Sequence, residues 1–221
     1  MTISERHNTR RTNECGESET GFTLIELIVS MILTLIILGV AVTVFSAALK
    51  GRDYQSARTD AIVSAQAAIN IISRDVGNSG YGLLNNGIVQ ADSTADRLHF
   101  RTNVDNSNYT TTNPNEDVTF FCDDCNANGG SVVRYDASGS GTTSGIINRV
   151  SRIRFQYWDY NEITHALTGP FNVATLNTGR ITITLTVILN NISGSPGAAS
   201  ADVTVTSDVT LRNSPYMLNR Y

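Results

Sequence analysis

The chain has 221 residues, of which 41% are hydrophobic and 16% are charged, and its formal net charge at pH 7 is −4. This length suits one ordinary domain with an appendage, and the composition excludes both a disordered chain and a nucleic-acid-binding protein built on a basic surface. The charged residues are distributed unevenly along the chain, because residues 22–49 contain a single one, Glu26. We therefore expect a membrane-inserting segment followed by a soluble domain.

The apolar segment at residues 22–49 is long enough to cross a membrane. Its 28 residues would span roughly 42 Å as an α-helix at about 1.5 Å per residue, compared with roughly 30 Å of bilayer hydrocarbon. A cleavable signal peptide has a shorter apolar core of about 7 to 15 residues, although the small residues at 46–48 leave cleavage there as an alternative. Basic residues flank the segment equally, so they do not set its orientation.

A short motif opens the apolar segment. After a polar leader, residues 21–27 read Gly-Phe-Thr-Leu-Ile-Glu-Leu, which closely resembles the cleavage and methylation site of type IV prepilins and type II secretion pseudopilins. The resemblance implies that a membrane-embedded aspartyl prepilin peptidase cuts between Gly21 and Phe22 on the cytoplasmic side and methylates the new terminal amine of Phe22. Residues 1–21 would then be a leader, and the carboxy-terminal domain would lie outside the cytoplasm.

The same resemblance implies a location and a set of partners. The precursor would be a single-pass protein of the bacterial inner (cytoplasmic) membrane, and the processed chain would enter a pilus or pseudopilus. Its partners would be the prepilin peptidase, other pilin or pseudopilin subunits, the inner membrane and an assembly platform. No nucleic-acid partner is indicated.

Glu26 is the only charged residue of the apolar segment. A carboxylate near the centre of a spanning helix costs about 2.5 to 3.5 kcal/mol on insertion scales, so it is expected either near the water interface or beside a partner. One interpretation places Glu26 in the headgroup layer. The other, implied by the resemblance, pairs it with the positive amino terminus of the preceding subunit when helices stack, which would set the register of assembly.

A second, amphipathic stretch follows at residues 50–76. Its apolar and small residues recur at steps of three and four, which predicts a helix with one apolar stripe. The stripe comprises Tyr54, Ala57, Ala61, Ile62, Ala65, Ala68, Ile69, Ile72 and Val76. No proline interrupts residues 22–76, so we expect one helix of about 55 residues that ends at the glycines at 77, 80 and 82. A generic membrane anchor with a helical stalk is the alternative.

The rest of the chain, residues 83–221, is predicted to be a β-rich extracytoplasmic domain. Apolar residues alternate with polar ones in several stretches, most clearly with threonine. These stretches are 98–101, 118–122, 131–135, 152–157, 180–189 and 203–211, with a loop at 190–201. Antiparallel strands with one apolar face need a cover. We therefore expect an α+β fold in which the amphipathic half of the helix packs on an antiparallel sheet, in agreement with the pilin shape.

A second resemblance narrows the family. Ile72-Ser73-Arg74-Asp75-Val76 followed by Gly80-Tyr81-Gly82 is similar to the end of the long helix in PilW-like minor pilins and pseudopilin J relatives. Residues 153–157 and 209–213 look like that group too. The residues at 77–79 and the long leader depart from its pattern, which weakens the subgroup more than the superfamily.

The cysteines predict a disulfide. Cys15 lies in the leader, so processing would leave Cys122 and Cys125 as an even pair in an extracytoplasmic domain. A zinc site would have to recruit His99 and His165, neither of which stands at finger spacing. The residues Asp124, Asn126, Asn128 and Gly129 match only the first half of a calcium loop, so no metal is expected.

Enzymatic motifs are missing from the sequence, which has no glycine-rich phosphate loop and no Gly-x-Ser-x-Gly elbow. His99 alternates with apolar neighbours and is expected to face solvent from a strand. The aromatic group of Tyr157, Trp158 and Tyr160 is expected to pack in the core. We therefore expect neither catalytic residues nor a cofactor.

The expected function is that of a minor pilin-like subunit that takes part in the assembly or priming of a type IV pilus. A pseudopilin of a type II secretion system is one alternative, and a membrane-anchored adhesin or receptor is another. An enzyme tethered by an ordinary signal anchor is the third.

The processing site can be tested at Gly21. Protein extracted from the membrane should have lost residues 1–21 and gained one methyl group, as measured by intact mass. Replacing Gly21 with a larger residue should leave the full-length precursor, because a bulky side chain would obstruct the peptidase at the cut. Normal maturation of that variant would refute the prepilin assignment.

Overall fold

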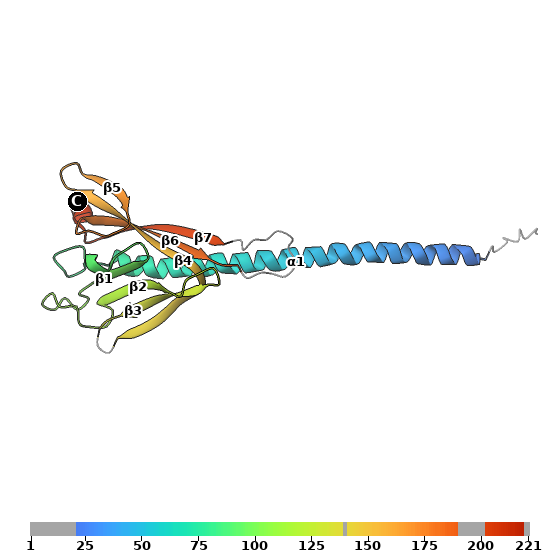
Figure 1. The fold of residues 1–221 in the computed structure, drawn as a ribbon, viewed down its shortest axis with the longest axis horizontal. Helices are drawn as coiled ribbons and strands as arrows, with labels where there is room; N and C mark the ends of the chain where they lie inside the picture. The colour runs from blue at the N-terminus through green and yellow to red at the C-terminus, as the bar shows by residue number, and fades with distance from the viewer. Residues whose placement is uncertain (1–20, 139–140, 190–201, 219–221) are drawn as a thin grey trace, which may run out of the picture. The chain divides into compact units, whose positions relative to one another are not determined.

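The computed structural model describes residues 21–138, 141–189 and 202–218 (Figure 1). Most of the expected leader, Cys15 and the expected loop at 190–201 lie outside the described residues. The chain forms two units, Met1–Ala48 and Leu49–Tyr221, and the long helix α1 (Leu24–Gly77) contributes to both.

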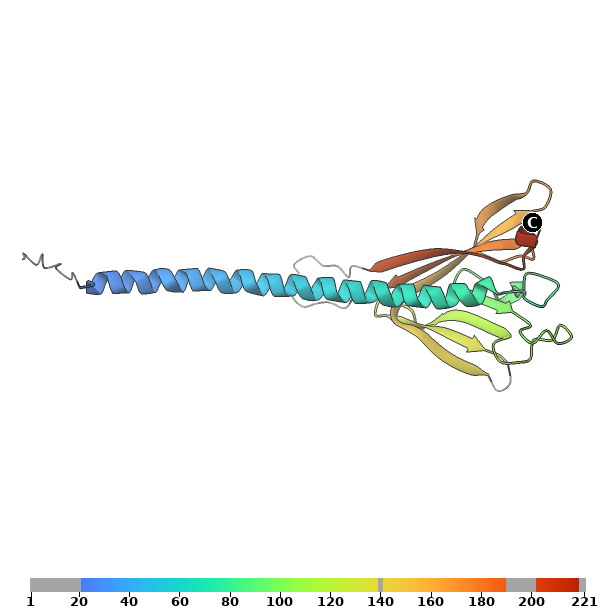
Figure 2. The same ribbon diagram turned by 180° about the vertical axis from the view of Figure 1, so that it is seen from behind.

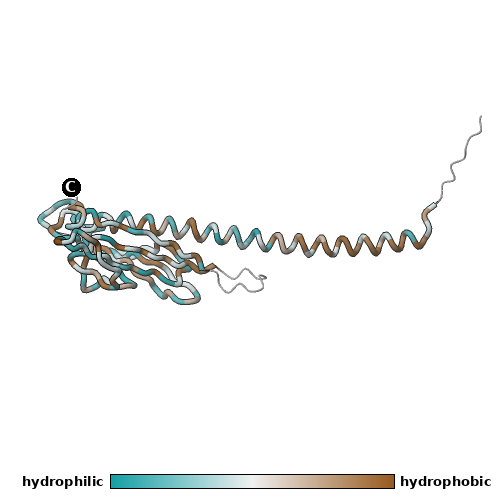
Figure 3. Tube along the Cα trace, turned by 90° about the horizontal axis from the view of Figure 1, so that it is seen from above, coloured by the Kyte–Doolittle hydropathy of each residue, from teal (hydrophilic) through white to brown (hydrophobic). Residues whose placement is uncertain are grey.

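The first half of α1 is apolar all round. Every residue from Leu24 to Leu49 is exposed in the single chain, and this part of the trace is predominantly hydrophobic in Figure 3. Its hydroxyl groups donate to carbonyls one turn back, as from Ser30 to Leu27 at 2.8 Å and from Thr34 to Ser30 at 2.7 Å. Internal bonds of this kind suit a helix in lipid, where water is not available as a partner. By length and composition, α1 can cross a membrane.

The second half of α1 packs on a sheet through the predicted stripe. Five stripe residues are buried, and the other four are partly buried. The buried ones are Ala65, Ala68, Ile69, Ile72 and Val76. Full burial of an aliphatic side chain such as Ile72 is worth roughly 1.5 to 3 kcal/mol, so the stripe is the main attachment of this part of the helix.

The sheet is antiparallel and follows the order β1-β2-β3-β4-β6-β7, with β5 paired to β4. Its strands are β1 (Arg97–Arg101), β2 (Asp117–Asp123), β3 (Gly130–Asp136), β4 (Thr142–Asn161), β5 (Ala166–Phe171), β6 (Thr178–Val187) and β7 (Val203–Thr210). Two short helices complete the fold, η1 (Gln90–Asp92) and α2 (Pro215–Leu218). The expected α+β layout is confirmed: an apolar helix packed on a carboxy-terminal antiparallel sheet.

The long strand β4 joins the two parts of the sheet. Its first half pairs with β3, its second half pairs with β6, and its end also pairs with β5. Figures 1 and 2 show β2 and β3 on one side of the second half of α1 and β6 and β7 on the other. Apolar residues of both parts therefore meet the same helix, and Phe100 and Phe120 stack with ring centroids 6.0 Å apart.

The sequence did not predict two strand segments. Residues 142–149 and β5 carry no apolar alternation, and β5 contains Gly169 and Pro170, which usually mark turns. These segments become strands because β3 and β4 offer them edges to pair with.

The helix ends in a glycine-rich turn that folds back on β1. Gly80 has φ +77°, and a Cβ atom there would lie 2.4 Å from the carbonyl oxygen of Asn85. Its N–H donates to the carbonyl of Arg101 at 2.9 Å, and the N–H of Arg101 donates to Gly87 at 2.7 Å. Glycine is required because the backbones approach so closely with a positive φ.

Buried Asn86 anchors this turn to the β5–β6 connection. Its side-chain Nδ2 donates to the carbonyls of Thr175, Leu176 and Thr178 at 3.0 to 3.2 Å. Its Oδ1 accepts from the N–H of Ile88 at 3.1 Å. One fully buried amide thus connects segments about ninety residues apart.

Replacing Asn86 with Ala should lower the free energy of unfolding by roughly 3 kcal/mol, because buried carbonyls lose their donor and a cavity forms. Asn70→Ala, at an exposed position of α1, should change it by less than about 0.5 kcal/mol. Denaturant unfolding of the full chain measures both. Equal effects would show that Asn86 is not an anchor.

Candidate functional site

The predicted processing residues precede α1. Gly21 and Phe22 are exposed, and a Cβ atom at Gly21 would meet no atom within 4 Å. Nothing in the described part of the fold therefore requires glycine at position 21. If the residue is required, the requirement comes from another molecule.

Thr23 and Glu26 form a capping box at the start of α1. The N–H and the hydroxyl of Thr23 donate to Glu26 Oε2 at 3.0 and 2.9 Å, and the N–H of Glu26 donates to Thr23 Oγ1 at 3.4 Å. This is the reciprocal arrangement that a Thr-x-x-Glu spacing predicts. The capping box was not among the predicted features, although the spacing of Thr23 and Glu26 in the sequence indicates it. Glu26 therefore has a partner within its own chain.

Cys122 and Cys125 are joined by a disulfide at the end of β2. In the loop between and after them, Asn126 Nδ2 donates to Asp124 Oδ1 at 3.0 Å, and Asn126 Oδ1 accepts from the N–H of Asn128 at 2.8 Å. The oxygen atoms of the partial calcium pattern thus serve the turn itself. Across the described residues, no group of three or more His, Cys, Asp or Glu residues could hold a metal ion.

The expectation that His99 faces solvent is wrong. Its side chain is buried under η1, with Nδ1 2.9 Å from Asp92 Oδ2 and Nε2 bonded to Asp117 Oδ1. The irregular segment around η1 covers the face of β1 that alternation alone leaves open. The hydrogen bond from His99 is the main cause that lowers the pKa of Asp92.

The aromatic group is mainly core, as expected. Tyr157 and Tyr160 are buried, and the Tyr157 hydroxyl donates to the carbonyl of Thr94 at 2.8 Å. Trp158 is half-buried on the opposite face, where its indole N–H donates to Thr182 and the guanidinium of Arg180 lies 4.4 Å from the ring centroid. Trp158 is therefore occupied by its own neighbours.

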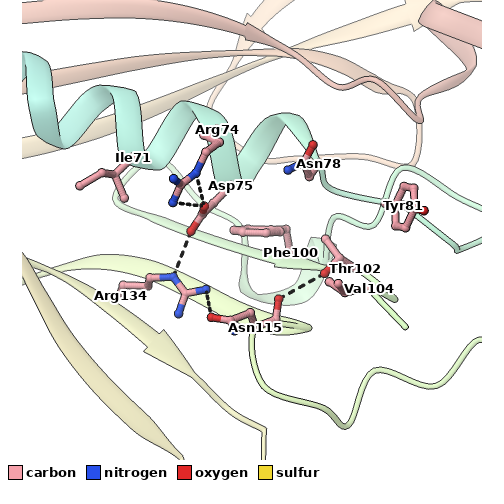
Figure 4. A pocket seen from close by; sticks show the side chains of 10 residues that line it. All are labelled: Ile71, Arg74, Asp75, Asn78, Tyr81, Phe100, Thr102, Val104, Asn115 and Arg134. Atoms are coloured by element: carbon pink, nitrogen blue, oxygen red, sulfur yellow. Dashed lines mark hydrogen bonds and ion pairs between the residues drawn. The ribbon is translucent and has the colours of Figure 1, made fainter. Parts of the chain in front are cut away.

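The strongest candidate for a binding site is a cleft of about 700 Å³ where the end of α1 meets β1 and β3 (Figure 4). Its lining includes both apolar and polar side chains. The apolar members are Ile71, Phe100 and Val104, with Tyr81 at the edge, and the polar ones are Arg74, Asp75, Asn78, Thr102, Asn115 and Arg134. Neither cleft nor lining was predicted, because these residues lie far apart in the sequence.

An ion pair connects the two walls of the cleft. Arg134 Nε lies 3.0 Å from Asp75 Oδ2, and both side chains are about five-sixths buried, with 16% and 17% exposed. Arg134 Nη2 also donates to Asn115 Oδ1 at 2.9 Å. Arg74, by contrast, is 72% exposed and reaches Asp75 at only 3.4 Å. Arg74 and Asp75, which are adjacent in the Ile-Ser-Arg-Asp-Val signature, therefore have different roles. Asp75 links the helix to the sheet, and Arg74 lies at the exposed edge of the cleft.

The loop between β1 and β2 forms one wall of the cleft, and two carboxylates, Glu116 and Asp136, hold its backbone. Glu116 accepts from the N–H groups of Val104 and Asn113, each at 2.8 Å. Asp136 accepts from the N–H of Asn115 at 2.5 Å. Burial by itself would raise the pKa of Asp136, but hydrogen bonds from Ser138 and Asn115 outweigh it and hold the pKa below its ordinary value. The wall is therefore ordered by charged acceptors.

Comparisons with protein-family models, with curated proteins and with solved structures give no match to this chain. Its function is therefore inferred from its own residues and geometry.

The Asp75–Arg134 pair should stabilise the fold. Asp75→Ala should lower the free energy of unfolding by roughly 2 kcal/mol, because it leaves a largely buried guanidinium without its carboxylate. Arg74→Gln should change it by less than about 0.5 kcal/mol, as for an exposed ion pair. A double-mutant cycle with Arg134→Met should give a coupling of at least about 1 kcal/mol. A coupling near zero would contradict this role.

Proposed function

We propose that the chain is a minor pilin-like subunit that is cleaved and N-methylated by a prepilin peptidase and helps to assemble or prime a type IV pilus. The observation that carries the proposal is the Gly-Phe-Thr-Leu-Ile-Glu motif at the start of a helix whose first half buries no residue. A pseudopilin of a type II secretion system has the same requirements and is the nearest alternative.

The apolar half of α1 supports this proposal on physical grounds. A helix that exposes large side chains on every face, such as Leu24, Ile37 and Phe45, is not stable in water and needs lipid or other apolar helices around it. The same surface suits both environments. A subunit of this kind can therefore begin in the inner membrane, with its β domain outside the cytoplasm, and later pack against the helices of other subunits.

The capping box sharpens the proposed role of Glu26. In the single chain its carboxylate accepts from the N–H and the hydroxyl of Thr23, the residue before α1. A capped carboxylate is held in one place, so it can also meet the terminal amine of a neighbouring subunit without a large loss of side-chain entropy. Glu26 can therefore cap its own helix and also pair with the terminal amine of a neighbouring subunit. Substitutions at positions 23 and 26 can separate the two roles.

Three variants distinguish pairing from capping. Glu26→Gln removes the charge and leaves a side chain that can still cap, Thr23→Ala removes the hydroxyl and keeps the charge, and Glu26→Ala removes both functions. Pairing predicts that Glu26→Gln and Glu26→Ala are cleaved and retained in the membrane but lost from sheared filaments, whereas Thr23→Ala assembles. Quantitative immunoblots of filament and membrane fractions measure this.

The opposite pattern would reject pairing. If Glu26→Gln enters filaments as well as the unchanged protein does, the charge has no role in assembly. Failure of Thr23→Ala together with Glu26→Ala would instead assign the defect to the cap. Intact masses of the membrane-held variants serve as the control that processing is unchanged.

A membrane-anchored binding module remains the second candidate function. The specific observation in its favour is the cleft between α1 and β1, whose lining combines apolar and polar side chains. A filament subunit with such a cleft would carry both functions.

A further inference from the structure

The hydrogen-bonding capacity left unused around the cleft consists mainly of donors. Asp75 accepts from Arg74 on Oδ1 and from Arg134 on Oδ2. Arg134 uses Nε and Nη2, which leaves Nη1 without an acceptor within the described part of the chain. The side-chain Nδ2 atoms of Asn78 and Asn115 have no acceptor among the described residues either. A ligand that supplies acceptors would satisfy all of these groups.

The cleft lining has one more positive than negative charge, and Arg74 carries it because Arg134 pairs with Asp75. With two arginines and one aspartate, the lining of the cleft carries a formal charge of +1. Asp75 is already neutralised by the shorter contact to Arg134. Arg74 reaches Asp75 with Nε and Nη2 only at 3.4 Å, and its Nη1 is available to an anionic group. Guanidinium groups donate charge-assisted hydrogen bonds to carboxylates, which favours this anion in the cleft.

The floor of the cleft favours an apolar group next to that anion. Phe100 forms a buried base, while Ile71, Tyr81 and Val104 are 36%, 51% and 61% exposed. Figure 4 shows Phe100 between Ile71 on one side and Tyr81 and Val104 on the other. Covering them would remove apolar surface from water, which is the main source of affinity in concave sites.

We propose that this cleft binds an extended peptide segment of a partner protein, in which a carboxylate side chain stands beside an apolar one. The carboxylate meets Arg74, and the apolar side chain covers the exposed side chain of Val104. Asn78 and Asn115 donate to the backbone carbonyls. The two amide donors favour a peptide over a fatty acid, which has a carboxylate and an apolar chain but no further acceptors.

The site is preorganised for such a segment. The Asp75–Arg134 pair fixes α1 against β3, and Glu116 fixes the backbone at Val104. Binding therefore needs little ordering of the protein, which is what allows a short segment to bind measurably. This site does not depend on the proposed filament function, since a membrane-anchored protein could use it equally.

The probes are three blocked tripeptides, N-acetyl-Leu-Glu-Leu-amide and its Gln and Lys counterparts. They are titrated onto the full chain in lipid nanodiscs by ligand-observed NMR, with empty nanodiscs as the blank. The Glu peptide should bind about tenfold more tightly than the Gln peptide, because one charge-assisted hydrogen bond distinguishes them. The Lys peptide should bind most weakly.

Arg74→Gln should weaken the Glu peptide about tenfold, to the level of the Gln peptide. Arg58 is another exposed arginine on α1, outside the cleft lining, and Arg58→Gln should leave the affinity of the Glu peptide unchanged. Val104→Ser should weaken all three peptides by a similar factor. Because Arg74 and Val104 are exposed, these variants should fold normally, and circular dichroism checks this.

Several results would overturn the proposal. They are equal binding of the Glu and Gln peptides, equal effects of Arg74→Gln and Arg58→Gln, and no binding of any peptide. Decanoate is the competing probe. If decanoate binds in an Arg74-dependent manner while the peptides do not, the cleft takes an acidic lipid and the peptide is the wrong occupant.

Discussion

The rest of the unit Leu49–Tyr221 depends on one contact. The apolar stripe of α1 is buried between the two parts of the sheet that β4 joins. Ile69, Ile72 and Val76 meet apolar residues from both parts of the sheet, which β4 holds together. Without this helix, the inner faces of β2 and β6 would both be open to water. The turn at Gly80, the amide of Asn86 and the Asp75–Arg134 pair all act where the stripe ends, so each of them secures the end of the helix against the sheet.

Local periodicity explains how much of this fold could be predicted. The stripe of α1 and the Val/Thr alternation of β6 and β7 depend on neighbours in sequence, so pattern reasoning finds them. The strand β5 and the first half of β4 depend on edges supplied by other strands, which a single stretch of sequence does not reveal. The error at His99 has the same origin, since η1 covers it without any periodic signal.

The amino-terminal motif and the cleft also differ in how far they could be predicted from local sequence. The amino-terminal motif is a run of adjacent residues, and its Thr-x-x-Glu spacing contained the capping box. The cleft joins residues that are 59 positions apart, as for Asp75 and Arg134. Only the fold brings them together. The quoted Arg-Asp signature named both a structural carboxylate and a rim guanidinium, and sequence alone could not tell which residue has which role.

The internal hydroxyl bonds of the first half of α1 have a mechanical consequence. Because Ser30, Thr34 and Ser46 donate to their own helix, their hydroxyl protons are not free to form directional bonds with a neighbouring helix. Contact between this segment and a neighbouring helix then consists mainly of dispersion forces. The energy of such contacts changes little when one apolar helix slides or turns against another. In the proposed filament, the axial position of each helix would then depend on the charge at Glu26 and on the folded domains. Between these two points the helices could shift under load and recover.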